Sequence, residues 1–249
     1  MTRTAALLTT ILLTQSLLLS MPDAAAQSST TRILDLGQAQ GGTNNTQGAS
    51  IGNAKSGSAT VSMGGLRQIQ DGSNNQQRAD IGNANGGSAT VRVAGSVTQV
   101  QSGSNNRQVA NVGNASGGST SVNVAGSITQ AQSGSNNRQG VNVGNAKGGS
   151  AMVSVAGSVI QVQSGSNGRQ VANIGNTRGG NVIVAVGNII QYQGGGGCQQ
   201  IDIGNGPGSG IVQTGDIIMT EYSKKIEIGT DGVRDDEQPC NPGDPIEGE

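Results

Sequence analysis

Residues 99–114 read QVQSGSNNRQVANVGN, and this stretch recurs with small changes between residues 38 and 205. The copies begin at Gln38, Gln68, Gln99, Gln130, Gln161 and Gln191, and the last copy is one residue shorter than the others. The spacing of their starts is nearly constant, and such a period is typical of a solenoid, in which a coil buries its inner face only when a neighbour stacks on it.

The composition on its own resembles that of a disordered polymer. The chain contains 43 glycines, 33% hydrophobic residues and 1% aromatic residues, which is well below a globular average. A disordered chain, however, has no reason to keep the same residue type at the same phase six times. Stacked coils do, because equivalent positions touch along the stacking axis. We therefore expect an ordered chain with a thin core of Val, Ile, Ala, Gln and Asn.

Strict alternation within each copy predicts strands with one face turned inward. In the third copy and the residues before it, Val91, Val93, Val97, Gln99 and Gln101 lie at alternate positions of the chain, which we call one parity. Gly-Gly and Ser-Gly-Ser-Asn supply turns. A further bend is expected at residues 94–96, because the second coil has one residue fewer there and a corner tolerates a deletion. The pattern predicts an all-β solenoid of stacked cross-β coils of about 31 residues, roughly six coils with about three short strands each, and an irregular C-terminal segment.

Four inward columns follow from this parity. Coils about 4.8 Å apart bring the members of a column close enough for each side-chain amide to donate to the next, which satisfies polar groups that are costly to bury. The alternative, amides on a soluble surface, does not explain why their parity matches that of Val and Ile. The predicted ladders are Gln40, Gln70, Gln101, Gln132 and Gln163; Gln47, Gln77, Gln108, Gln139 and Gln170; and Asn53, Asn83, Asn114, Asn145 and Asn176. The apolar column is Ile51, Ile81, Val112, Val143 and Ile174.

The motif Gln-x-Gly-x-x-Asn recurs as Gln40-Gly42-Asn45, Gln70-Gly72-Asn75, Gln101-Gly103-Asn106 and Gln132-Gly134-Asn137. It resembles the curlin repeat, whose family comprises secreted subunits that polymerise into curli, the adhesive amyloid fibres of bacterial biofilms. The coil here is longer than the family's two-strand unit, and Gly168 replaces the Asn in the fifth copy. The resemblance implies a homopolymer at the cell surface, with an export or nucleator protein as a possible partner.

Residues 1–26 are expected to form a secretory signal, with Arg3 followed by an apolar run and small residues up to Ala26. A membrane anchor needs about 18 to 20 apolar residues, and this run is shorter and interrupted by polar residues. We therefore predict a secreted chain with no membrane insertion after signal removal. The repeat solenoid is assigned to residues 27–197, and a capping segment with an acidic disordered tail to residues 198–249.

The repeat region and the C-terminal segment of the secreted chain carry opposite net charges. Residues 27–197 contain ten basic and three acidic side chains, a net charge of +7, whereas residues 198–249 contain three basic and eleven acidic ones, a net charge of −8. Arg107, Arg138 and Arg169 share one turn position and are expected to stack outside the coil. They form either a basic stripe for a polyanion, such as a surface polysaccharide, nucleic acid or a neighbour's acidic tail, or solvated charges that discourage uncontrolled packing. The acidic segment either caps the last coil or docks onto a fibre anchor or export partner.

Cys198 and Cys240 are expected to pair in an exported chain, with intermolecular bonds or free thiols as alternatives. The chain has no histidine, so we predict neither an enzyme nor a metal or cofactor site. Two functions remain. The first is a fibre subunit, and the alternative is a capped monomeric solenoid that binds a polysaccharide or another polyanion. They differ in whether the C-terminal segment blocks the edge of the last coil.

Overall fold

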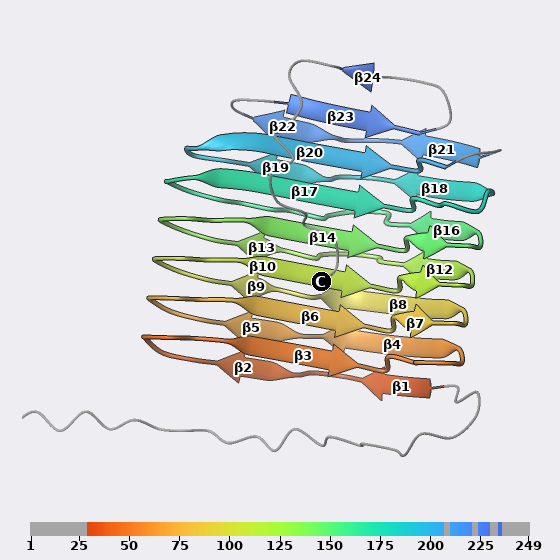
Figure 1. Ribbon diagram of the computed structural model, residues 1–249, viewed down its shortest axis with the longest axis horizontal. Helices are drawn as coiled ribbons and strands as arrows, with labels where there is room; N and C mark the ends of the chain where they lie inside the picture. Colours follow the sequence, from red (N-terminus) through yellow and green to blue (C-terminus); the bar gives the residue numbers. More distant parts are fainter. Residues whose placement is uncertain (1–28, 207–209, 221–223, 230–233, 236–249) are drawn as a thin grey trace, which may run out of the picture.

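The computed structural model describes residues 29–206, 210–220, 224–229 and 234–235. These residues form an all-β solenoid of about six turns that repeat about every 31 residues, which confirms the predicted fold class (Figure 1). The expected signal segment and the acidic tail beyond residue 235 lie outside the described residues. In the described part of the chain, no helix is long and apolar enough to cross a membrane.

The turns stack into three parallel sheets, which we call sheets A, B and C, and each turn contributes one strand to each sheet except at Gln161, where sheet B has only isolated bridges. Sheet A contains, in order, β1 (Ser29–Ile33), β4 (Ala59–Gly65), β8 (Ala89–Ser96), β12 (Thr120–Asn123), β16 (Ala151–Ser154), β18 (Val182–Val186) and β21 (Gly210–Thr214). Sheet B contains β2 (Gly37–Ala39), β5 (Arg67–Ile69), β9 (Gln99–Val100) and β13 (Gln130–Ala131). Bridges at Gln161 link it to β19 (Ile190–Tyr192), which pairs with β22 (Ile218–Thr220).

Sheet C is the longest stack, and a short fourth sheet accompanies it. Sheet C contains β3 (Gln47–Ile51), β6 (Gln77–Ile81), β10 (Gln108–Val112), β14 (Gln139–Val143), β17 (Gly168–Ile174), β20 (Gly197–Ile203), β23 (Lys224–Ile228) and β24 (Arg234–Asp235). The fourth sheet contains β7 (Ala84–Asn85), β11 (Ala115–Ser116) and β15 (Ala146–Lys147). Most coils therefore carry the three expected strands, the coil of Gln161 has isolated bridges in place of its sheet B strand, and the middle coils add a two-residue strand.

The strands pair in register, so each residue stacks on its equivalent in the next coil. Gln108 of β10 pairs with Gln139 of β14, for example, and Val112 pairs with Val143. The register shifts once between β4 and β8, after Met63. This shift lies at the bend predicted for residues 94–96 and accommodates the missing residue. Gly95 has a positive φ there, and a Cβ on it would lie 2.6 Å from the Gly64 carbonyl oxygen, so the corner requires glycine.

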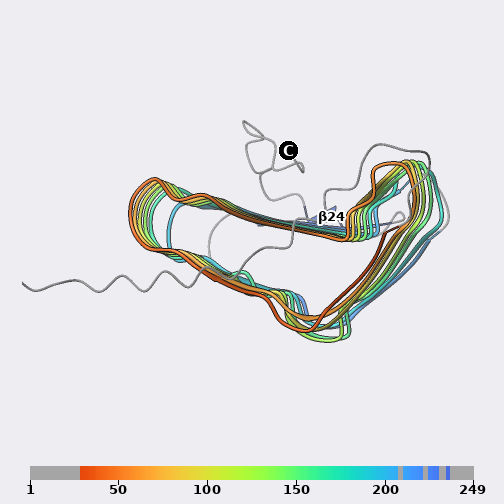
Figure 2. The ribbon, with the colours of Figure 1, turned by 90° about the horizontal axis from the view of Figure 1, so that it is seen from below.

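Seen along its axis, the solenoid has a narrow arm and a wider end (Figure 2). Apolar side chains from sheets A and C, such as Val91, Val93 and Val112, form one continuous core. Sheets B and C bury amide side chains instead, including Gln99 and Gln108, which are 0% exposed. The molecule thus has an apolar core along part of its cross-section and an amide core along the rest.

The stack continues past residue 197, where we expected the repeats to end. Strand β20 pairs with β17 on one side and with β23 on the other, and β21 and β22 extend sheets A and B. The last layer is shorter in sequence than a full coil, because Ile203 pairs with Ile228, whereas Val112 pairs with Val143. Strand β24 runs antiparallel to β23 and is the end strand of sheet C. Part of the segment assigned as a cap is therefore solenoid.

Candidate assembly site: amide ladders and coil edges

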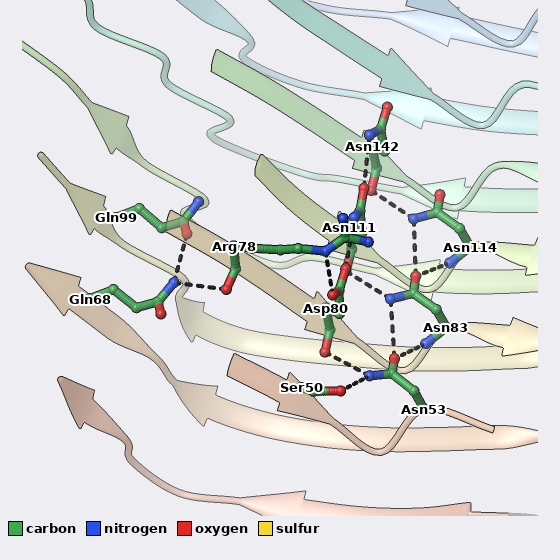
Figure 3. Close-up of polar contacts among 10 residues, drawn as sticks. All are labelled: Ser50, Asn53, Gln68, Arg78, Asp80, Asn83, Gln99, Asn111, Asn114 and Asn142. Carbon is green, nitrogen blue, oxygen red and sulfur yellow. Dashed lines mark hydrogen bonds and ion pairs between the residues drawn. The ribbon is translucent and has the colours of Figure 1, made fainter. Parts of the chain in front are cut away.

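A glutamine ladder runs through all six repeats. The Nε2 atom of each member donates to the Oε1 atom of the next, at 3.0 Å from Gln38 to Gln68 and 2.6 Å from Gln99 to Gln130. Figure 3 shows the bond from Gln68 to Gln99, which is 2.7 Å long. The ladder continues at 2.8 Å to Gln161 and 2.5 Å to Gln191. We did not predict this column as a ladder. Its signal was present in the sequence, since these glutamines start every repeat and share the inward parity.

The predicted asparagine ladder of Asn53 forms, but it does not face inward as predicted. Asn53 is exposed and the other four members are half-buried, because the glycine before each of them, such as Gly113, has a positive φ that interrupts the alternation of the strand. The Oδ1 atom of Asn83 accepts both the backbone N–H of Asn114, at 2.9 Å, and its side-chain Nδ2, at 3.1 Å. The Nδ2 atom of Asn114 also reaches the carbonyl oxygen of Asn142 in the following coil, at 3.2 Å. The column extends one step further than expected, because Asn205 donates its backbone N–H to Asn176. Each asparagine thus ties backbone and side chain of adjacent coils together.

The predicted ladder of Gln47, Gln77, Gln108, Gln139 and Gln170 takes a different form. Four of these side chains donate to backbone carbonyls on the sheet B side of the next coil, as Gln108 does to Ala131 at 2.5 Å. Gln77, Gln139 and Gln170 make the equivalent bond. Only Gln139 to Gln170, at 3.4 Å, follows the predicted side-chain pattern. The prediction was wrong because the arm is narrow enough for a glutamine amide to cross to the facing sheet.

The column of Gln40, Gln70, Gln101, Gln132 and Gln163 is not a ladder. Gln40 is exposed and the other four are buried. Neither amide atom of Gln101 or Gln163 has a hydrogen-bond partner, and Gln132 accepts from Gln108 at 3.2 Å. The alternation predicted the burial of four of these five side chains correctly but not their hydrogen bonds, because inward direction alone does not set the distance between amide atoms.

The predicted apolar column of Ile51, Ile81, Val112, Val143 and Ile174 is confirmed. All five side chains are at most 5% exposed and pair in register along sheet C. Ile203, which is 0% exposed, continues the column in β20. A regular strip of aliphatic side chains therefore extends from the first coil beyond residue 197.

The Ser-Gly-Ser-Asn-Asn turns carry two further ladders that sequence reasoning missed. The inner one joins buried Asn45, Asn75, Asn106 and Asn137 at 2.9 to 3.0 Å. The Nδ2 atom of Asn106 also closes its own turn on the Ser102 carbonyl, at 3.2 Å. The outer ladder joins exposed Asn44, Asn74, Asn105, Asn136 and Asn167. The paired asparagines of the motif thus serve one ladder inside the turn and one outside it.

A final ladder lies on the outer face of sheet C. Asn111 donates to Asp80 at 2.7 Å and Asn142 donates to Asn111 at 2.8 Å (Figure 3). Asn173 continues the ladder by donating to Asn142 at 2.9 Å. The Nε atom of Arg78 lies 2.6 Å from the Asp80 carboxylate. Asp80 therefore takes the place of an asparagine in the ladder, and Arg78 beside it neutralises the charge of its carboxylate.

Replacing Asp80 by asparagine should change the free energy of unfolding by less than about 1 kcal/mol. The ion pair with Arg78 is partly exposed, and such pairs contribute about 0 to 1 kcal/mol. An asparagine still offers an oxygen to Asn111, as Asn111 does to Asn142. Asp80→Ala is the matched control and should cost more, because it leaves buried Asn111 without this acceptor. Urea unfolding of both variants tests the difference, and equal losses would contradict the role assigned to the ladder.

The predicted basic stripe is placed at the start of the sheet C strands. Arg107, Arg138 and Arg169 are half-buried and stand one residue before the in-register partners Gln108, Gln139 and Gln170. Cys198 occupies the next position of this column, since Gly168 pairs with Gly197 and Gln170 with Gln199. Cys198 is disulfide-bonded, whereas Cys240, its expected partner, lies outside the described residues.

The two ends of the stack differ. At the first coil, β1, β2 and β3 are the end strands of sheets A, B and C. At the other end, the antiparallel β24 follows β23. Unpaired strand edges template further strands, whereas short strands that break the pattern protect an edge. The first coil is therefore the more open edge of the described solenoid.

The described residues bring together no group of three or more His, Cys, Asp or Glu side chains that could hold a metal ion. No protein family, curated protein or solved structure matches this chain. The likeness to curlin repeats thus rests on the Gln-x-Gly-x-x-Asn motifs alone.

Proposed function

We propose that this chain is a secreted structural subunit that polymerises into curli-like amyloid fibres for adhesion and biofilm matrix. The supporting observation is the in-register stack of parallel coils whose side-chain ladders run through the repeats to an open first coil. Another copy placed below that coil continues the same spacing, the same amide ladders and the same aliphatic strip. The assembly needs no new type of contact, since each coil already binds its neighbour in this way.

Strand β3 provides the clearest growing edge. The backbone N–H of Gln47 donates to Gln76 at 3.0 Å, and the carbonyl of Ile51 accepts from Gly82 at 2.7 Å, so these groups face the second coil. Neighbouring residues of a strand direct their backbone groups to opposite sides. Gly48 and Ser50 therefore point their backbone groups toward the open edge, where a strand of another copy can pair with them.

Assembly of residues 27–249 tests the proposal. The chain is purified in denaturant, diluted, and followed by thioflavin T fluorescence, electron microscopy and fibre diffraction. We expect fibres with a meridional reflection near about 4.7 Å, the spacing between strands. A soluble monomer whose state does not change with concentration would overturn the fibre function.

Replacing Gly48 by proline should slow seeded fibre growth by about tenfold or more. Proline removes the N–H that faces the open edge, and an edge is where a sheet tolerates proline. Loss of one edge hydrogen bond together with a steric block corresponds to at least about 1.4 kcal/mol, which is a tenfold decrease in the rate of growth. Gly48→Ala is the control, because a Cβ at this position meets nothing within 4 Å. Growth of Gly48→Pro at the parent rate, from seeds of the parent chain, would exclude β3 as the growing edge.

The alternative function is that of a monomeric solenoid that binds a surface polysaccharide or another polyanion. Strand β24 favours this alternative, because an antiparallel end strand hinders the stacking of another copy. A chain that ends after Gly229 lacks this strand. If the shortened chain assembles into fibres faster than the full chain, β24 slows polymerisation. If both lengths stay monomeric and bind dextran sulfate, the binding function replaces the fibre function.

A further inference from the structure

The outer face of sheet A changes from polar to apolar along the stack. One column of outward side chains pairs in register from β1 to β21, and its members are Thr30, Thr60, Thr90, Ser121, Met152, Ile183 and Ile211. All of them are exposed. Hydroxyl side chains occupy the first four strands, whereas Met152, Ile183 and Ile211, in the last three, are 52%, 43% and 64% exposed. The face therefore has a polar half and an apolar half.

The apolar half is contiguous and uncharged. Strands β16, β18 and β21 are consecutive in sheet A (Figure 1), so Met152, Ile183 and Ile211 follow one another at about 4.8 Å. These strands contain no charged residue. Their second outward column consists of Ser154, Ala185 and Gln213. Scattered exposed aliphatic residues are ordinary, whereas a contiguous strip marks a surface that binds a partner. We call the three aliphatic side chains the sheet A strip.

We propose that the sheet A strip binds the same strip of a second copy of this chain, face to face, with the two solenoid axes antiparallel. A two-fold axis beside Ile183 places this side chain opposite its own equivalent and places Met152 opposite Ile211 of the other copy. The strip is complementary to itself, because aliphatic side chains then meet only aliphatic side chains. The contact joins subunits sideways, so it goes beyond the proposed stacking of coils and does not depend on it.

Charge on the same face selects the antiparallel arrangement. Arg92 is exposed in the second outward column, on β8, which lies three strands from β18. Parallel axes would superpose each strand on its equivalent and place Arg92 near Arg92 of the other copy, across about 10 Å. Antiparallel axes centred on β18 place β8 past the other copy's β21, the end strand of sheet A. Only the antiparallel arrangement buries the strip without opposing like charges, which cost energy.

The contact is small, so the dimer should be weak. Strands β16, β18 and β21 have four or five residues each, and they cover about 14 by 17 Å at the usual strand spacing and rise. A stable interface covers about 800 Å² on each partner. We therefore expect a dissociation constant above about 1 μM. The dimer directs its two open first coils to opposite ends. If the subunits form fibres as proposed, this supplies the second growing end that β24 hinders within one subunit.

Cross-linking of cysteine variants of residues 27–249 tests the arrangement in freshly diluted protein, before fibres appear. Ile183→Cys places two thiols opposite each other across about 10 Å, which a short bismaleimide spans. This reagent does not react with the disulfide at Cys198. Thr90→Cys is the matched control, because Thr90 is exposed in the same column but lies on β8. We expect a cross-linked dimer at position 183 and a yield at least about tenfold lower at position 90.

A mixture of Met152→Cys and Ile211→Cys chains, one of them isotope-labelled, tests the direction of the axes. We expect more links between the two variants than within either one, measured by mass spectrometry. A predominance of links from Met152→Cys to Met152→Cys would indicate parallel axes and overturn the proposal.

Two results at position 183 also overturn the proposal. Equal yields at positions 183 and 90 would show random collision, and absence of a link at position 183 would leave the strip to a partner other than this chain. Fibre formation is measured separately in the parent chain. Fibres without the cross-link overturn only the dimer, whereas the cross-link without fibres supports the dimer and overturns only the fibre function.

Discussion

Replacing Gly118 by alanine is expected to lower the free energy of unfolding by at least about 3 kcal/mol. A Cβ on Gly118 would lie 2.2 Å from the carbonyl oxygen of Gly87 and 2.5 Å from its carbon. These are backbone atoms of the adjacent coil and cannot rotate away. The φ of Gly118 is not positive, so the cost is one of space and not of backbone conformation. Overpacking that side chains can absorb already costs about 1 to 3 kcal/mol.

Relief of this clash requires the two coils to separate at that corner. The backbone hydrogen bonds from Ala89 to Ser119, at 2.9 Å, and from Gly86 to Ser116 span the same junction. Both lengthen if the corner opens, so sheet A and the short fourth sheet lose pairing together. The free energy of unfolding can therefore fall by more than most single substitutions cause. Single substitutions that disrupt several interactions together can cost more than about 4 kcal/mol.

Gly103→Ala is the matched control for Gly118→Ala. Gly103 also lies in a turn of the third repeat, but a Cβ there meets nothing within 4 Å, so its stability should stay within about 0.5 kcal/mol of the parent. Urea unfolding followed by circular dichroism measures both variants. A Gly118→Ala chain as stable as Gly103→Ala would show that the coils tolerate separation at this corner.

The second large effect is expected from Gln99→Met, which should cost about 2 to 4 kcal/mol. Methionine has nearly the same length as glutamine and fills the same space, so the change isolates the amide. Gln68 loses its acceptor at 2.7 Å, and Gln130 loses its donor at 2.6 Å. Each buried amide left partly unsatisfied costs about 1 to 3 kcal/mol.

Gln101→Met is the control two residues away and should be neutral or stabilising. Gln101 is 2% exposed, and neither of its amide atoms has a hydrogen-bond partner. Its replacement removes a buried polar group without orphaning another, which is the favourable case for an apolar substitution. Equal losses at positions 99 and 101 in urea unfolding would refute the distinction between a bonded and an unbonded glutamine column.

The sequence by itself determined the architecture of this protein. A nearly fixed repeat period and alternation within each repeat were enough to predict parallel coils in register, the inward apolar column of Ile51 and the bend at residues 94–96. The reason is physical, because stacked coils place equivalent positions in contact, so the same side-chain chemistry must recur at each step. The ladder of Asn53 and the apolar column of Ile51 follow from that rule alone.

Only the tertiary structure decided which amides bond to which. Gln99, Gln101 and Gln108 are all inward and buried, yet the first forms a ladder, the second has no partner and the third crosses to the facing sheet. The separation of sheets B and C sets these outcomes, and parity does not encode that distance. The repeat motif did not predict that the stack continues to Ile228, because β21 and β23 pair with the preceding coil through backbone hydrogen bonds, which any side-chain sequence can make.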